Sequence, residues 1–153
     1  MKKIANYSLV ALFVSFTMLT SCSGEDAPSS LSPTSVINNV TQGTWRVTYY
    51  LDSNLDETND FSGYNFTFGA NNVLSATNGN ATVTGSWSVV SDSSSDDDSS
   101  SSDLDFNIAF ASPANFADLT DDWDIVSYTS TKIELIDVSG GNGGTDYLTF
   151  TKN

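Results

Sequence analysis

The residues with the clearest capacity for chemistry lie in a short acidic segment, residues 52–60. Four oxygen-bearing side chains there take positions 1, 3, 5 and 9 of the spacing found in calcium-binding loops: Asp52, Asn54, Asp56 and Asp60. Glu57 stands where such a loop needs glycine for its sharp turn, and Gly63 replaces the bidentate glutamate. The spacing predicts a calcium site, whereas the two departures favour a solvated acidic loop.

The charge balance limits both partners and catalysis. The 153 residues include 5 Lys and Arg, 19 Asp and Glu and no histidine, for a formal charge of −14. A surface this acidic repels phosphates, so no nucleic acid partner is expected. Histidine, the usual general base, is missing, and the sequence has neither a nucleophile elbow nor a phosphate-binding loop. We therefore expect a non-enzymatic protein with no cofactor apart from calcium.

The N-terminus has the pattern of an export signal. A basic start precedes an apolar stretch over residues 4–19, which is short for a membrane span. The stretch ends in Leu19-Thr20-Ser21-Cys22, which resembles the lipobox of bacterial lipoproteins. This resemblance implies that residues 1–21 are a signal peptide and that Cys22, the only cysteine, is lipidated. The alternative is an ordinary secretory signal whose removal leaves a free thiol.

The residues after Cys22 favour a location at the outer membrane. Ser23-Gly24-Glu25-Asp26 resembles the surface-export signal of Bacteroidota lipoproteins. The resemblance implies a protein held in the outer membrane by its acyl chains and exposed at the cell surface. Residues 22–35 are then predicted to form a flexible tether, because serine and proline are frequent in them.

The rest of the chain predicts an all-β domain over residues 36–153. Apolar and polar residues alternate with a period of two, which is typical of half-buried strands. The predicted strands cover residues 45–51, 64–68, 73–76, 82–89, 104–110, 123–128, 133–138 and 147–151. Asn78-Gly79-Asn80 predicts a tight hairpin, residues 33–42 a short helical lead-in, and residues 113–119 a helical turn. Residues 91–103, composed of serine and aspartate, predict a disordered loop.

Eight sequential strands favour an antiparallel up-and-down barrel, because closure removes exposed strand edges. A β-sandwich is the alternative. Gly43-Thr44-Trp45, which opens the first strand, is similar to the Gly-x-Trp signature of lipocalins, and residues 61–68 and 85–87 look like small lipocalin-like lipoproteins of Bacteroidota. The resemblance implies a barrel that binds a small apolar molecule, with the tryptophan packed against a late-strand arginine. The only arginine, however, is Arg46 in the first strand.

Two functions follow from the aromatic residues predicted to point inward. The first is a carrier of a small hydrophobic molecule, whose cavity would be lined by Trp45, Tyr49, Phe66, Trp87 and Phe106. The second is a surface interaction or structural module, because an eight-stranded barrel is narrow enough for side chains to fill. In that case the acidic loops would bind calcium or a protein partner, which the sequence does not identify. We expect a monomer in both cases.

Overall fold

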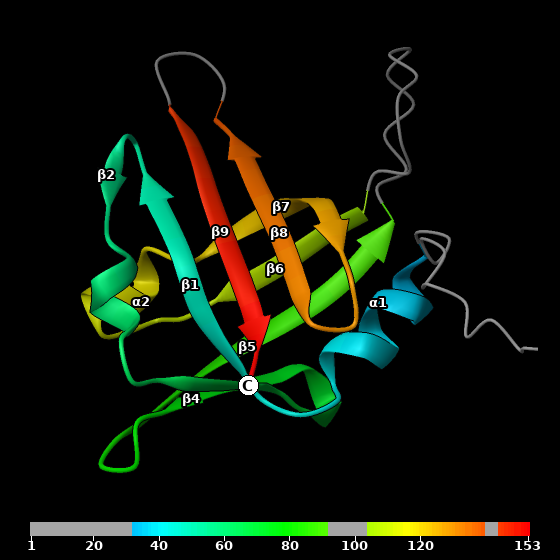
Figure 1. The fold of residues 1–153 in the computed structure, drawn as a ribbon, viewed down its shortest axis with the longest axis horizontal. Helices are drawn as coiled ribbons and strands as arrows, with labels where there is room; N and C mark the ends of the chain where they lie inside the picture. The colour runs from blue at the N-terminus through cyan, green and yellow to red at the C-terminus, as the bar shows by residue number, and fades with distance from the viewer. Residues whose placement is uncertain (1–31, 92–103, 140–143) are drawn as a thin grey trace, which may run out of the picture.

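The computed structural model describes residues 32–91, 104–139 and 144–153, which form a closed, eight-stranded antiparallel barrel (Figure 1). The predicted signal peptide, Cys22 and nearly all of the predicted serine and aspartate loop lie outside these residues. Eight strands make the barrel: β1 (Trp45–Asp52), β3 (Asn65–Phe68), β4 (Val73–Thr77), β5 (Thr82–Ser91), β6 (Leu104–Ala109), β7 (Asp121–Tyr128), β8 (Lys132–Val138) and β9 (Thr145–Lys152). All eight predicted strands are confirmed.

Closure comes from the pairing of the first barrel strand with the last. Strand β9 pairs with β1 from Lys152 opposite Trp45 to Tyr147 opposite Leu51. Every other barrel strand pairs with its neighbour in the sequence, so the barrel is of the up-and-down type and the sandwich alternative is excluded. The two-residue strand β2 (Leu55–Asp56) forms a hairpin with the last two residues of β1 and is not one of the barrel strands. The predicted hairpin is confirmed at Asn78, whose side-chain oxygen accepts the N–H groups of Asn80 and Ala81.

Helix α1 (Pro33–Val40) closes the end of the barrel that we call the base. Its start is fixed by a capping box between Ser32 and Ser35, and proline occupies its first turn. The indole N–H of Trp45 donates to the carbonyl of Val40 at 2.8 Å, which joins the helix to the first strand. The helix includes residues 33–35 of the predicted tether. Within the described ranges, no helix has the length and apolar character needed to cross a membrane.

Aromatic side chains fill the barrel interior. The ring of Phe68 contacts the rings of Trp87, Phe106 and Phe150, with centroids 5.3–5.4 Å apart in edge-to-face geometry. No polar or charged residue is buried within the described part of the chain. Four of the five aromatics predicted to line the interior are buried: Trp45, Phe66, Trp87 and Phe106.

Tyr49 is the exception, and its predicted inward orientation is wrong. The pairing of β1 with β9 shifts register between Val47 and Tyr49, which marks a bulge. Because a bulge adds one residue to one strand, it reverses the faces of the residues that follow. Tyr49 is therefore 40% exposed, and Tyr50 lies inside with 1% exposure.

Two short helical segments close the opposite end of the barrel, which we call the mouth. They are the 3-10 helix η1 (Thr58–Phe61) and helix α2 (Ala114–Ala117), the latter formed within the predicted turn. Phe61 and Phe116 meet edge to face with centroids 5.4 Å apart, and both are 1% exposed. The hydroxyl of Tyr50 donates to the carbonyl of Asp118 at 2.7 Å. Figure 1 shows α2 and α1 on opposite sides of the barrel.

Candidate functional site

Carboxylates from several elements gather around the mouth. The pKa of Tyr50 is raised well above its usual range, first by burial and then by nearby negative charges. Those charges belong to four residues at the ends of four different segments: Asp52, Asp118, Glu57 and Asp146. Because Coulomb energy falls with distance, these four carboxylates lie near the Tyr50 phenol. The mouth therefore has carboxylates beside its apolar plug.

Glu57 lies among these carboxylates. Its pKa is raised, first by desolvation and then by the charges of Asp52, Asp118 and Asp60. Asp60 lies in η1, and Asp118 follows α2. The two helical segments that plug the mouth therefore also place negative charge at the surface, because Asp60 and Asp118 are both exposed.

Asp121 and Asp137 add negative charge near Asp146. Burial is the main cause that raises the pKa of Asp121 to about 6, and the charges of Asp137 and Asp122 contribute further. Asp137 on β8 lies directly opposite Asp146 on β9, and like charges opposite each other destabilise a strand pair. We define the acidic rim as Asp52, Glu57, Asp118, Asp121, Asp137 and Asp146.

The predicted calcium loop is a hairpin turn in this structure. Ser53 and Asn54 both have positive φ angles, of 46° and 73°, and they connect the paired residues Asp52 and Leu55. Hydrogen bonds from the Thr58 side chain and from its backbone N–H lower the pKa of Asp56. The described residues contain no group of three or more Asp, Glu, Cys or His side chains that could hold a metal ion. Calcium binding stays a prediction without a preformed site.

The aromatics predicted to bind a ligand belong to the packed interior. Trp45, Phe66 and Phe106 are completely buried, and Trp87 is 6% exposed. Trp87 also borders a groove of about 320 Å³ between α1, the 3-10 helix η2 (Ala70–Asn72) and β5. Its indole N–H donates to the carbonyl of Gly69 at 3.0 Å. Of the predicted ligand residues, Trp87 lines this groove, and ligand binding itself stays a prediction.

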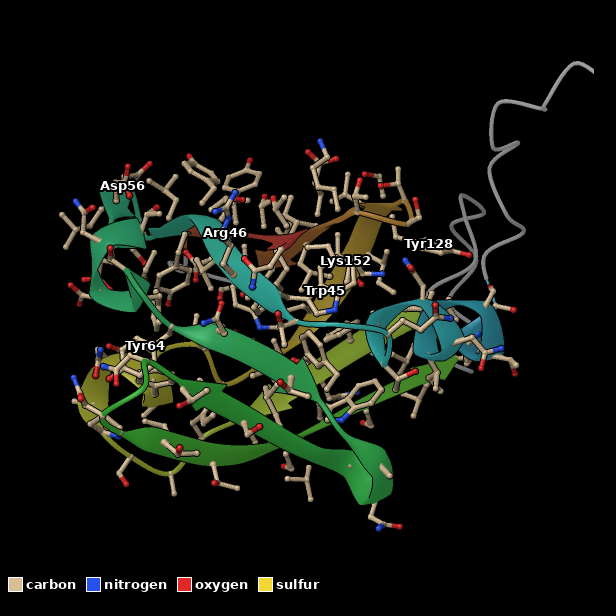
Figure 2. The ribbon with its side chains drawn as sticks, turned by 60° about the horizontal axis from the view of Figure 1, so that its bottom comes forward. Trp45, Arg46, Asp56, Tyr64, Tyr128 and Lys152 are labelled. Atoms are coloured by element: carbon tan, nitrogen blue, oxygen red, sulfur yellow. The ribbon has the colours of Figure 1, made fainter. Side chains whose placement is uncertain are left out.

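The base contains a cation that the sequence analysis missed. The Lys152 ammonium nitrogen lies 4.9 Å from the centroid of the Trp45 ring, and these two residues are paired across β9 and β1 (Figure 2). A late-strand cation over the tryptophan is what the lipocalin resemblance implies, with lysine in place of arginine. The position of Lys152 directly after the last predicted strand, residues 147–151, was the available signal.

These features define a small all-β barrel with a packed interior and an acidic rim at its mouth. Comparison with family models finds no match for the chain, and comparison with curated proteins finds none either. Among solved structures, the chain is similar to a DUF4847 family protein from Bacteroides vulgatus. The two share 17% identity over 77% of this chain and 97% of that chain, with a TM-score of 0.46.

The raised pKa of Asp121 predicts a pH-dependent stability. Its folded-state pKa lies above its unfolded value, so its contribution is present at low pH and is lost as the pH rises from about 4 through 6. We expect Asp121→Asn to raise the free energy of unfolding at pH 7.5 by roughly 1 kcal/mol after allowance for solvent screening. The gain should vanish near pH 4. Urea unfolding followed by tryptophan fluorescence measures both values.

The matched control is Asp60→Asn, which removes the same charge from an exposed side chain in η1. A gain that is equal at pH 4 and pH 7.5, or equal for both variants, would show that Asp121 is not the titrating group.

Proposed function

We propose that the chain is a non-enzymatic, lipid-anchored barrel that uses its acidic rim to bind a basic partner at the outer membrane. The observation that carries this proposal is the convergence of carboxylates around a mouth that aromatic side chains have plugged. Because the packed aromatic interior leaves little space for a ligand, we expect other molecules to bind at the outer surface. The absence of histidine supports a role without catalysis.

Electrostatics supports a cationic partner. The rim carboxylates come from separate segments and repel one another: desolvation is the main cause of the raised pKa values of Glu57 and Asp121, and neighbouring negative charges raise both further. A basic peptide or protein surface would relieve that repulsion and would be attracted from a distance by the formal charge of −14. The calcium alternative has less support, because the described carboxylates form no metal-binding group.

The position of α1 supports anchoring through Cys22. The described domain begins at Ser32, ten residues after Cys22, and leads at once into the helix that closes the base. Asn39 of α1 donates to the carbonyl of Thr129, which lies in the connection between β7 and β8. A tether attached at the base would hold that end toward the membrane and turn the rim away from it, toward a partner.

The anchoring proposal predicts that membrane attachment depends on one atom. Cys22→Ala removes the sulfur that would carry the acyl chain, so the variant should leave the membrane fraction and appear in the soluble fraction. Two or more acyl chains hold a protein stably on a bilayer, so the unchanged chain should resist a carbonate wash. Ser23→Ala, one residue further on, is the matched control and should stay in the membrane fraction. Retention of Cys22→Ala in the washed membrane would contradict the proposal.

The rim proposal predicts charge-specific binding of a basic peptide. The whole chain, purified in a non-ionic detergent, should bind an octalysine peptide, and the affinity should fall as salt is added. The triple variant Asp52→Asn, Glu57→Gln and Asp118→Asn should weaken binding at least fivefold by calorimetry. A second triple variant removes the same charge from the wall of β6, β7 and β8: Asp105→Asn, Asp124→Asn and Glu134→Gln. Equal losses in the two variants would show that only net charge matters, which would refute a defined rim.

The groove beside Trp87 supports a second candidate function, the binding of a small apolar molecule in that groove. Ile37 of α1 and Val89 and Val90 of β5 line it, and Val90 is 44% exposed. The neutral probe N-phenyl-1-naphthylamine should increase in fluorescence when it binds, and Val90→Asp should weaken that binding at least fivefold. Val126→Asp makes the same change at a valine on β7 that is 59% exposed, and it should have no effect. An unchanged affinity in Val90→Asp would exclude this groove.

A further inference from the structure

A second groove opens where strands β1 and β3 separate. Their pairing consists of one residue pair, Trp45 opposite Phe66, after which η1 lies against β1 instead of β3. The resulting groove has a volume of about 370 Å³ and is lined by polar residues and by the half-buried Tyr64 ring, with the buried Val47 and Phe61 at its floor. Figure 2 shows Arg46 on β1 and Tyr64 ahead of β3, on the two sides of the gap.

The one charged side chain in this groove has the opposite sign to most charges of the molecule. Acidic residues outnumber basic ones by 19 to 5 in the chain, yet no Asp or Glu lines the groove, and its one charged side chain is that of Arg46. The two lysines within the described ranges are engaged, Lys132 with Glu134 at 2.8 Å and Lys152 with the Trp45 ring. Among the same residues, Arg46 is the one cation without an ion-pair or ring partner.

The neighbouring amides add further hydrogen-bond donors. The Asn153 side-chain N–H group donates to the Asn65 oxygen at 2.7 Å and to the Thr44 hydroxyl at 3.0 Å. These bonds orient the Asn65 amide and use its oxygen, so that its own NH₂ group is the part left for a ligand. The groove thus combines a guanidinium with an amide donor, and a guanidinium has no capacity to accept a hydrogen bond.

We propose that this groove binds a small molecule with one carboxylate and a short apolar group. A guanidinium matches a carboxylate in a two-bond fork, and Asn65 would donate to the same anion. The apolar part would lie against the half-buried ring of Tyr64. This site goes beyond the proposed function, because the rim attracts cations at the mouth whereas the groove selects an anion on the barrel wall.

The test is calorimetric titration of the whole chain in a non-ionic detergent with sodium benzoate at constant ionic strength. Benzoate carries both the carboxylate and the apolar group, whereas inorganic phosphate carries only an oxyanion. We expect saturable benzoate binding that Arg46→Gln weakens at least tenfold. Arg46→Lys, which keeps the charge and loses the fork, should weaken it severalfold, as should Asn65→Ala. Because Arg46 and Asn65 are exposed, these variants should fold, and thermal melting by circular dichroism verifies it.

The control variant is Lys132→Gln, which removes an exposed cation from β8 and should leave the benzoate affinity unchanged. Three outcomes would overturn the proposal: no saturable benzoate binding, equal affinity in Arg46→Gln, or an equal loss in Lys132→Gln. Phosphate that binds as tightly as benzoate would also overturn it, because the apolar part of the groove would then contribute nothing.

Discussion

The main constraint on this structure is the width of its barrel, because the interior of eight strands is only about wide enough for side chains to fill. Phe68 lies where this packing is densest, in contact with Trp87, Phe106 and Phe150. Edge-to-face rings gain more than their buried area alone provides, so a filled interior stabilises the barrel strongly. The same filling removes the room that a carrier needs. Stability and internal ligand binding therefore compete for one volume, and in this chain the aromatics occupy it.

Four amphipathic aromatics attach the helical segments to the barrel. Each places its ring inside and donates its polar hydrogen to a carbonyl at or near the end of a helical segment. The bonds run from Trp45 to Val40, from Trp87 to Gly69, from Trp123 to Leu119 and from Tyr50 to Asp118. The carbonyls of Val40, Asp118 and Leu119 lie at or just after the C-terminal ends of α1 and α2, where the last carbonyl groups of a helix have no partner within it. The plugs at the mouth and base are thus held by hydrogen bonds from residues that also form the core.

Period-two alternation was sufficient to predict all eight strands, because one face of each strand is buried. It failed at Tyr49, since no residue type marks the bulge that turns Tyr50 inward. Asp52 and Asn54 were interpreted as calcium ligands, yet these residue types also favour turns. In the structure they belong to the hairpin turn between β1 and β2. The rim could not be predicted, because its carboxylates are far apart in the sequence and only barrel closure brings Asp52 near Asp146.

Closure also explains how a chain this acidic has both an acidic rim and an opening that is bordered by an arginine. Carboxylates at strand ends cannot enter the aromatic interior without a large desolvation cost, so they collect at the mouth where strands β1, β7, β8 and β9 begin or end. Between β1 and β3 the register ends after one pair, and outward-facing Arg46 borders an opening that no Asp or Glu lines. The separation of charge thus follows from strand geometry: the rim carboxylates lie at or near the ends of strands, and Arg46 lies where two strands part.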